Sequence, residues 1–323
     1  MNRPVATPSK AKPAQTNQAA ATPAAGQPAA AKAGPGKAGG AGGEAAQPAP
    51  FFMLGCVRSG TTMLRDALRM HPHLASPEET HFFRWGEPYG TEAMSRALSN
   101  NAVLKKHREL DGITEAEFAD LLRQCTSRAE LYMRYMALYM QRKKPGAKRW
   151  FDKTPQNVYG ALLAASSMPR SRFVHIVREP VNVVSSLRIG RIVKVENLTG
   201  ACNYWNEAIQ IVAGLKRAYP ARVYELRYED FVAEPMTQMK LLLDFIGEPF
   251  DAKWFSALNT RKVDHQDEGV LSPAEQDVVR HLCAAGRRRY GYEMQAPQPQ
   301  AGGLISNKVP GARKPANASQ APS

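Results

Sequence analysis

Short apolar runs and amphipathic stretches alternate through the central part of the chain. Residues 51–54 form a continuous apolar run before Gly55, which is typical of a strand that is buried on both faces. Residues 61–70 then carry apolar side chains at helical spacing, and Pro72 ends that pattern. The pattern predicts a strand, a loop and a helix in direct succession.

Residues 91–144 are rich in Ala, Leu, Met, Arg and Glu, a composition that favours helices. Two sets of side chains recur there at helical spacing: Phe118, Leu121, Leu122 and Cys125, then Leu131, Tyr135, Leu138 and Tyr139. We expect two or more helices in this stretch. Its Met and Tyr side chains are interpreted as core residues rather than ligand contacts.

The rest of the pattern alternates strands with helices. Strands are predicted to end near residues 150–152 and to span 172–177 and 222–226, and helices to span 180–187, 201–219 and 236–246. Such alternation implies a parallel sheet with helices on both faces. We therefore predict an α/β fold, a single domain with a central parallel sheet flanked by helices, with a helical insertion. His175 lies within an apolar strand and is interpreted as a core histidine.

Both ends of the chain differ in composition from its centre. Residues 1–49 consist mainly of Ala, Pro, Gly, Gln, Lys and Thr, and residues 295–323 have the same character. Segments of this kind bury too little apolar surface to offset the entropy of ordering, so we expect both to be disordered. The predicted folded domain is therefore 50–294.

The chain carries a formal net charge of +14. The amino-terminal segment contributes +4 and the carboxy-terminal segment +3, which leaves +7 on the body. A basic body suits a polyanionic ligand, although a basic soluble surface is the plainer interpretation. No recognisable nucleic-acid module is present, so no specific nucleic-acid partner is expected.

No apolar run approaches the roughly 20 residues of a membrane-spanning helix, and no secretory signal is recognisable. The default expectation is a cytoplasmic protein without a transmembrane segment. The four cysteines are far apart and lack paired metal-ligand spacing, so they are interpreted as reduced thiols: Cys56, Cys125, Cys202 and Cys283.

The sequence GCVRSGTT, residues 55–62, has the glycine spacing of a phosphate-binding loop, but Thr61 occupies the position of the loop lysine. Without that lysine, kinase or ATPase chemistry is poorly supported. Consecutive backbone N–H groups at a helix start, the hydroxyls of Ser59, Thr61 and Thr62, and the adjacent Arg58 still suit an anion. The loop is therefore a candidate site for a less charged group than a triphosphate.

A second candidate anion site follows the strand at 172–177. Arg178 stands at the end of that strand, and Ser186 lies eight residues later in the next predicted helix. An arginine fork and a serine hydroxyl can hold one phosphate. Alone this pair is weak evidence, but with the loop it predicts two separated phosphate sites on one sheet.

These two sites together resemble the sulfotransferases that use 3′-phosphoadenosine-5′-phosphosulfate (PAPS) and release adenosine 3′,5′-bisphosphate. In that family a loop like residues 58–62 binds the 5′-phosphosulfate, and an arginine with a serine eight residues later binds the 3′-phosphate. The resemblance extends to Asp152-Lys153-Thr154-Pro155 and to Arg227-Tyr228-Glu229-Asp230-Phe231, and it covers residues 51–292. It implies that Arg58, Ser59, Gly60, Thr61, Thr62, Arg178, Ser186 and Tyr228 bind the donor, with no metal.

The resemblance also implies a general base. The segment containing Glu78 and Glu79 is similar to the base segment of tyrosylprotein sulfotransferases and, through His81-Phe82-Phe83, to that of heparan sulfate sulfotransferases. Both comparisons select Glu79, while a pair of solvated loop charges is the alternative. Pro155 stands where cytosolic sulfotransferases carry a catalytic histidine.

The comparison further implies that Lys153 and Arg58 stabilise the leaving oxygen, although an ion pair of Lys153 with Asp152 is nearly as plausible. The family's carboxy-terminal Arg-Lys-Gly triplet is missing, and nothing in the sequence assigns Arg287, Arg288 or Arg289 to its role.

The function implied is sulfuryl transfer to an acceptor hydroxyl on a glycan, a peptide tyrosine or a small molecule. Residues 84–149, with the linker 189–203, are expected to form the acceptor side. A nucleotide kinase and a non-catalytic nucleotide-binding protein stay open as alternatives, and so does a homodimer. The sequence leaves the acceptor unidentified.

Overall fold

The computed structural model describes residues 48–190, 193–258 and 269–294, which belong to one compact unit. The terminal segments for which the composition predicts disorder lie outside the described residues, apart from Pro48 and Ala49. Within the described part of the chain, no helix is long and apolar enough to cross a membrane.

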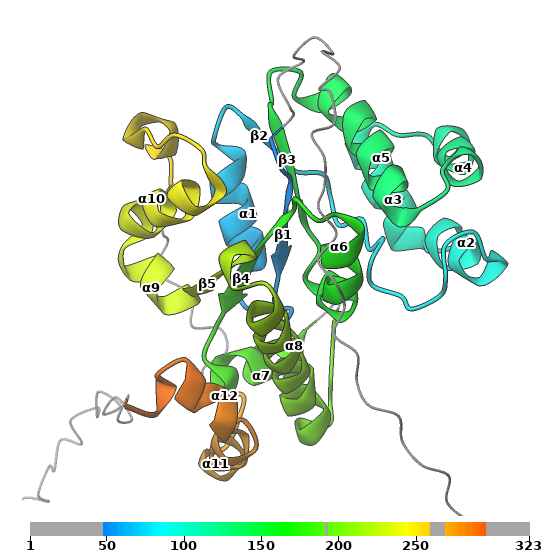
Figure 1. The fold of residues 1–323 in the computed structure, drawn as a ribbon. Coiled ribbons are helices and arrows are strands. Elements are labelled where there is room, and N and C mark those ends of the chain that lie inside the picture. Colours follow the sequence, from blue (N-terminus) through cyan, green and yellow to red (C-terminus); the bar gives the residue numbers. More distant parts are fainter. Residues whose placement is uncertain (1–47, 191–192, 259–268, 295–323) are drawn as a thin grey trace, which may run out of the picture. The chain divides into compact units, whose positions relative to one another are not determined.

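A five-stranded sheet forms the centre of this unit (Figure 1). Its strands are β1 (Phe51–Leu54), β2 (Leu74–Ala75), β3 (Arg149–Lys153), β4 (Arg172–Val177) and β5 (Val223–Arg227). They run parallel in the order β2-β3-β1-β4-β5. This arrangement confirms the predicted α/β fold. Strand β2 was not predicted, because two residues are too few to produce a periodic signal.

One face of the sheet is covered by α1 (Thr61–Arg69), α9 (Tyr228–Ala233) and α10 (Pro235–Ile246). Apolar side chains of α1 and α10 pack there against alternate residues of the strands, such as Phe51 and Met53. The predicted helices 61–70 and 236–246 are thus confirmed to within a residue or two. Helix α9, which directly follows β5, was not predicted from the sequence.

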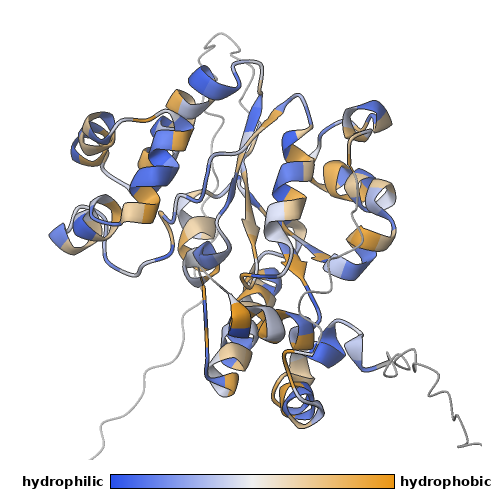
Figure 2. Cartoon of the chain, turned by 180° about the vertical axis from the view of Figure 1, so that it is seen from behind, coloured by the Kyte–Doolittle hydropathy of each residue, from blue (hydrophilic) through white to orange (hydrophobic). Residues whose placement is uncertain are grey.

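The opposite face is covered by α5 (Arg128–Lys143), α6 (Ala161–Ser167), α7 (Pro180–Ile189) and α8 (Leu198–Ala218). Phe52 and Leu54 point to this side, into a larger apolar cluster that contains Tyr132 and Trp205. Hydrophobic positions lie on the strands and on the inward sides of these helices (Figure 2). Both faces of the strands are therefore buried, which explains why they are continuous apolar runs.

The insertion between β2 and β3 begins with α2 (Glu92–Ser99), α3 (Ala102–Asp111) and α4 (Glu115–Gln124) and ends with α5. Polar residues begin these helices: Thr114 caps α4 in a capping box, and Thr91, Asn101 and Ser127 cap the other three. The predicted helical stretch is therefore four helices. On α5, Tyr132, Tyr135 and Met136 are core residues as predicted, whereas Met133 is exposed.

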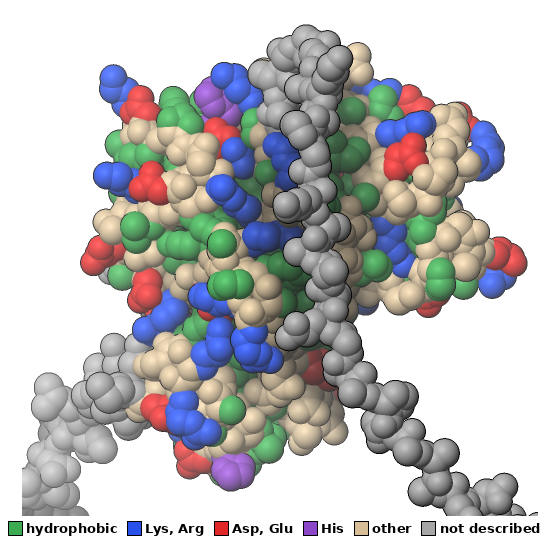
Figure 3. Space-filling view, viewed as in Figure 1, with side chains coloured by type: hydrophobic (Ala, Val, Ile, Leu, Met, Phe, Trp, Pro, Cys, Tyr) green, Lys and Arg blue, Asp and Glu red, His purple; other side chains and the backbone are tan. Residues whose placement is uncertain are grey.

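The carboxy-terminal part of the described chain contains α11 (Pro273–Leu282) and α12 (Ala284–Arg289), which the sequence analysis did not predict. Short 3₁₀ helices complete the fold: η1 (Pro155–Gly160), η2 (Pro220–Arg222), η3 (Ala252–Phe255) and η4 (Tyr292–Met294). The four cysteines are buried. His175 is fully buried, which confirms the prediction of a core histidine. Lys and Arg side chains lie over much of the face drawn in Figure 3, with acidic side chains among them.

Candidate active site

The sequence motifs meet at the carboxyl ends of neighbouring strands. Residues 55–62 follow β1, Lys153 ends β3, Arg178 follows β4 and Tyr228 follows β5. The chain leaves β1 towards β2 and β3 on one side and later returns to β4 on the other side. This point, where the strand order reverses, is where open parallel sheets bind ligands.

The loop between β1 and α1 has a backbone shaped for an anion. Arg58 and Gly60 both have positive φ angles, of 70° and 87°. The first N–H groups of α1 have no intrahelical partner, as at every helix start, and no described side chain caps them. The first turn also contains no acidic residue that would repel an anion. The Ser59 hydroxyl is buried without a hydrogen-bond partner among the described residues. An unpaired buried hydroxyl beside open N–H groups fits the phosphate end of a donor.

Tyr228 and Arg178 pack directly against this loop. A Cβ atom on Gly60 would lie 2.3 Å from Cδ2 of Tyr228, so only glycine allows the ring to approach this closely. The Arg178 guanidinium carbon lies 4.7 Å from the centre of the Tyr228 ring, and its Nη1 donates to the Arg58 carbonyl at 3.4 Å. The ends of β4 and β5 thus form one surface with the loop.

Arg58 and Ser186 connect the two predicted phosphate sites. The Nε of Arg58 donates to the Ser186 hydroxyl at 2.8 Å. The Arg58 side chain is exposed, while Ser186 is buried on α7. Arg58, Arg178, Ser186 and Tyr228 therefore form one group around the loop.

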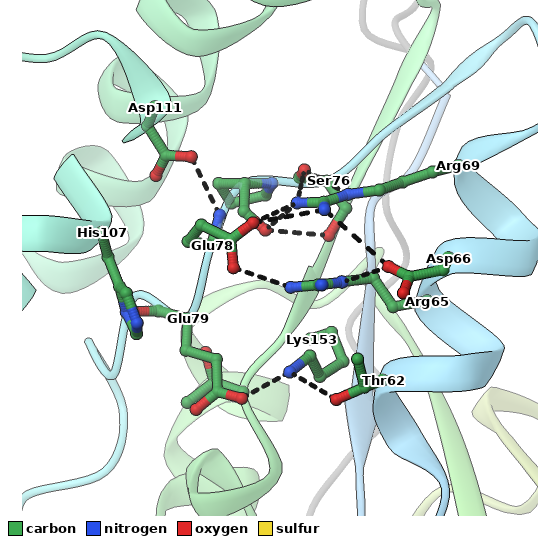
Figure 4. Close-up of polar contacts among 12 residues, drawn as sticks. Thr62, Arg65, Asp66, Arg69, Ser76, Glu78, Glu79, His107, Asp111 and Lys153 are labelled. Atoms are coloured by element: carbon green, nitrogen blue, oxygen red, sulfur yellow. Dashed lines mark hydrogen bonds and ion pairs between the residues drawn. The ribbon is translucent and has the colours of Figure 1, made fainter. Parts of the chain in front are cut away.

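Glu79 and Lys153 form an ion pair on the other side of the loop (Figure 4). Lys153 Nζ donates to Glu79 Oε1 and lies 3.5 Å from the Thr62 hydroxyl on α1. The Lys153 side chain is 3% exposed and that of Glu79 is 27% exposed. A lysine from β3 thus approaches the loop whose own lysine position holds Thr61.

The electrostatic surroundings keep Glu79 ionised. Burial raises the pKa of the Glu79 carboxyl, but a hydrogen bond from His81 and the charge of Lys153 outweigh burial and lower this pKa to about 2. His81 Nε2 lies 3.4 Å from Glu79 Oε2, and burial lowers the pKa of His81. Glu79 is therefore ionised at neutral pH.

Glu78 has a different surrounding, although it is the neighbour of Glu79. Its carboxylate pairs with Arg65 at 2.8 Å and with Arg69 at 3.2 Å on α1, and its backbone N–H donates to Asp111 at 2.9 Å (Figure 4). Glu78 therefore anchors the segment to α1 and α3. The alternative that both glutamates are solvated loop charges is wrong for this structure.

The suggested ion pair of Lys153 with Asp152 is also wrong. Consecutive residues of a strand point to opposite faces of the sheet, so Asp152 faces α5 while Lys153 faces α1. Asp152 accepts hydrogen bonds from Asn157 at 2.8 Å, Thr154 at 3.1 Å and Tyr132 at 3.3 Å. Despite these bonds, burial raises the pKa of Asp152 to about 7.

Two histidines near the candidate base were not predicted as functional residues. His81 has a left-handed backbone, with a φ of 58°, that brings its ring to Glu79. His107 on α3 approaches the Glu79 carbonyl through Nδ1 at 2.9 Å. The His-Phe-Phe segment was a usable signal for His81, whereas no local pattern connects residue 107 to residue 79.

Among the described residues, one group of side chains has the spacing of a metal site: His71, His73 and Glu248. Glu248 already pairs with Arg149 at 2.7 Å. His71 Nε2 lies 3.0 Å from the Pro249 carbonyl oxygen. His71 Nδ1 accepts a hydrogen bond from the His73 backbone N–H at 3.1 Å. These protein contacts already use both ring nitrogens of His71 and one carboxylate oxygen of Glu248.

Comparisons with known proteins show which family the chain matches. A sulfotransferase family profile matches residues 50–252, which is more than half of the chain. Omega-hydroxy-beta-dihydromenaquinone-9 sulfotransferase Stf3 of Mycobacterium bovis is 24% identical over 301 residues, covering 77% of this chain and 77% of the relative. Protein-tyrosine sulfotransferase A of Caenorhabditis elegans is 24% identical over 286 residues, covering 79% of this chain and 70% of the relative.

A solved structure, the sulfotransferase domain from the Synechococcus PCC 7002 olefin synthase, has a similar fold. It superposes with a TM-score of 0.57 at 23% sequence identity and covers 78% of this chain and 98% of that domain. The fold, the lysine-free loop and the family match lead to one conclusion. The chain is an enzyme that belongs to the sulfotransferase family.

Proposed function

We propose that this enzyme transfers a sulfuryl group from PAPS to an acceptor hydroxyl, with Glu79 as the general base. The observation that carries the proposal is the Glu79–Lys153 pair, which lies beside a phosphate-type loop with an unpaired serine hydroxyl. A base, a cation and an anion site are the three things that an in-line transfer requires from a protein.

The donor-binding residues are proposed from the two sides of the loop. The N–H groups at the start of α1, together with Ser59, Thr61 and Thr62, would hold the 5′-phosphosulfate. Arg178 and Ser186 would hold the 3′-phosphate, and the Tyr228 ring would lie near the adenine. PAPS supplies the sulfuryl group, and adenosine 3′,5′-bisphosphate is the remaining product.

In the proposed reaction the acceptor oxygen forms a bond to sulfur while the bond from sulfur to the phosphate oxygen breaks. Glu79 would take the proton of the acceptor hydroxyl: its carboxylate is ionised, and it is ion-paired with Lys153, which also lies next to Thr62 of the loop. Lys153 and Arg58 would stabilise the charge that develops on the departing phosphate oxygen. No proton is left unassigned, and the reaction needs no redox partner.

The acceptor is proposed to be a hydroxyl on a glycan, a peptide tyrosine or a small molecule. Two relatives support a broad class, since one is named for a hydroxylated menaquinone and the other for protein tyrosine. The insertion α2–α5 would form the acceptor side, because α3 contacts the backbone of the base segment.

The base is tested with Glu79→Gln and a matched control, Glu78→Gln, one residue away. A positioned base contributes about 10² to 10⁴-fold to the rate. We expect Glu79→Gln to lose turnover on that scale and still bind adenosine 3′,5′-bisphosphate. Glu78→Gln, which removes a charge that anchors the segment to α1 but not the base, should lose much less turnover. Normal turnover by Glu79→Gln would refute the assignment.

The reaction class is tested by incubating the full chain with ³⁵S-labelled PAPS and a cell extract, then identifying labelled molecules. Label in a hydroxyl-bearing acceptor supports the proposal and names the acceptor. Magnesium-dependent ATP turnover without sulfuryl transfer would indicate a kinase instead. Nucleotide binding without any turnover would indicate a non-catalytic binding protein.

A further inference from the structure

The segment formed by α12 and Tyr292, residues 284–292, packs next to the two residues that face the loop from β4 and β5. The Tyr292 hydroxyl lies 2.9 Å from Glu229 Oε2 and 3.4 Å from the Val177 carbonyl. Val177 directly precedes Arg178 in the chain, and Glu229 directly follows Tyr228. One fully buried tyrosine thus contacts both strand ends.

Glu229 and Glu179 extend this contact across the gap between the strand ends. The backbone N–H of Glu179 donates to Glu229 Oε1 at 2.9 Å, so both oxygens of Glu229 are used. Arg287 on α12 pairs with the Glu179 carboxylate at 3.2 Å and donates to the Tyr292 carbonyl at 2.8 Å. The same Glu179 carboxylate accepts the Val181 N–H at 2.6 Å and thereby caps α7.

Gly286 makes a third contact, through Trp205 on α8. A Cβ atom on Gly286 would lie 2.4 Å from Cζ3 of Trp205, so α12 lies directly on the indole ring. The indole Nε1 donates to the Arg178 carbonyl at 3.0 Å. Tyr292 therefore contacts the backbone just before Arg178, and Arg287 pairs with the side chain of Glu179 just after it. Gly286 is linked to the Arg178 carbonyl through Trp205.

We propose that residues 284–292 are a positioning element for the donor: they fix the strand ends so that Arg178 and Tyr228 face the loop in the binding arrangement. This inference rests on the proposed function, in which these two residues bind the nucleotide. Tyr292 and Arg287 act through Glu229 and Glu179, so they are positioning residues and not catalytic ones. Arg287 therefore has a structural partner and is not a free replacement for the missing Arg-Lys-Gly triplet.

The test uses the full-length enzyme with two pairs of variants. Tyr292→Phe removes one hydrogen bond to a charged acceptor and keeps the ring, and Arg287→Gln removes the charge that faces Glu179. Arg287→Lys keeps that charge. Arg288→Gln is the matched control, because Arg288 lies on the same helix and pairs with Glu293 at the exposed surface.

We expect Tyr292→Phe and Arg287→Gln each to raise the KM for PAPS and the Kd for adenosine 3′,5′-bisphosphate about tenfold, which matches the loss of a hydrogen bond to a charged group. The kcat at saturating PAPS and the KM for the acceptor stay near those of the wild type. Arg287→Lys should recover most of the affinity, and Arg288→Gln should leave it unchanged.

A merely structural role predicts lower thermal stability and a lower kcat at an unchanged KM for PAPS. If both Tyr292→Phe and Arg287→Gln gave that result while the wild-type enzyme bound adenosine 3′,5′-bisphosphate, the inference would be overturned. The proposed function would still stand. A wild-type enzyme that does not bind this nucleotide would overturn both.

Discussion

Replacing Lys153 by methionine removes the charge that faces Glu79 and keeps an unbranched side chain of similar length. Lys153 is 3% exposed and Glu79 is 27% exposed, so solvent screens this pair only in part. In Lys153→Met the carboxylate stays in the same place without its cation. Breaking a buried pair by removing one partner destabilises a protein more than removing both.

The size of the effect follows from the pKa of Glu79. This pKa is lowered from an ordinary 4.5 to about 2, which corresponds to about 3 kcal/mol at about 1.4 kcal/mol for each pKa unit. Since His81 provides part of the lowering, we expect Lys153→Met to reduce the free energy of unfolding by about 2 kcal/mol at neutral pH. A depressed carboxyl pKa adds stability above pH 4.5 that is lost as the pH falls towards 2.

The assay is denaturant unfolding of the wild type, Lys153→Met, Glu79→Gln and the double variant. We expect a coupling energy of about 2 kcal/mol at neutral pH. We also expect the penalty of Lys153→Met to shrink on acidification, because protonated Glu79 no longer needs a cation. If the free-energy changes of the two single variants were additive, and the penalty of Lys153→Met did not depend on pH, the ion pair would not be the cause of the low Glu79 pKa.

Two further predictions concern residues on either side of this pair. Asp152→Asn should gain stability relative to the wild type as the pH rises from about 4 to 7. The folded-state pKa of Asp152 is raised from 3.8 to about 7, so the wild type loses stability over this range and the variant does not. A difference in unfolding free energy that stays constant across this range would contradict the prediction. Gly60→Ala should weaken binding of adenosine 3′,5′-bisphosphate at least about tenfold, because the new Cβ displaces the Tyr228 ring. Gly90→Ala is its matched control, because Gly90 has a φ of 82° and no described atom lies within 4 Å of a Cβ there. This variant should lose about 1 kcal/mol of stability and keep the nucleotide affinity. Equal affinities in the two variants would exclude the clash.

The sequence was most informative where the signal is local. Continuous apolar runs identify β1 and β4 because both faces of these strands are buried. The glycine spacing of residues 55–62 identifies the loop, because its backbone needs a positive φ at Gly60. These features need no knowledge of distant parts of the chain.

Other features depend on contacts between distant residues, and the sequence could not decide them. The partner of Lys153 became clear only once the direction of β3 placed Lys153 towards Glu79 and Asp152 towards α5. The contact of Arg287 with Glu179 joins residues that are 108 positions apart. No periodic pattern or short motif encodes contacts of this kind.

The position of α3 limits how the enzyme can be recombined with its relatives. Helices α2–α4 add no strand to the sheet, so on topology alone they form a replaceable block. However, Asp111 and His107 of α3 contact the backbone of residues 78 and 79. A chimaera that exchanges these helices to change the acceptor must therefore import the base segment with them, and the smallest transferable unit begins before Glu78.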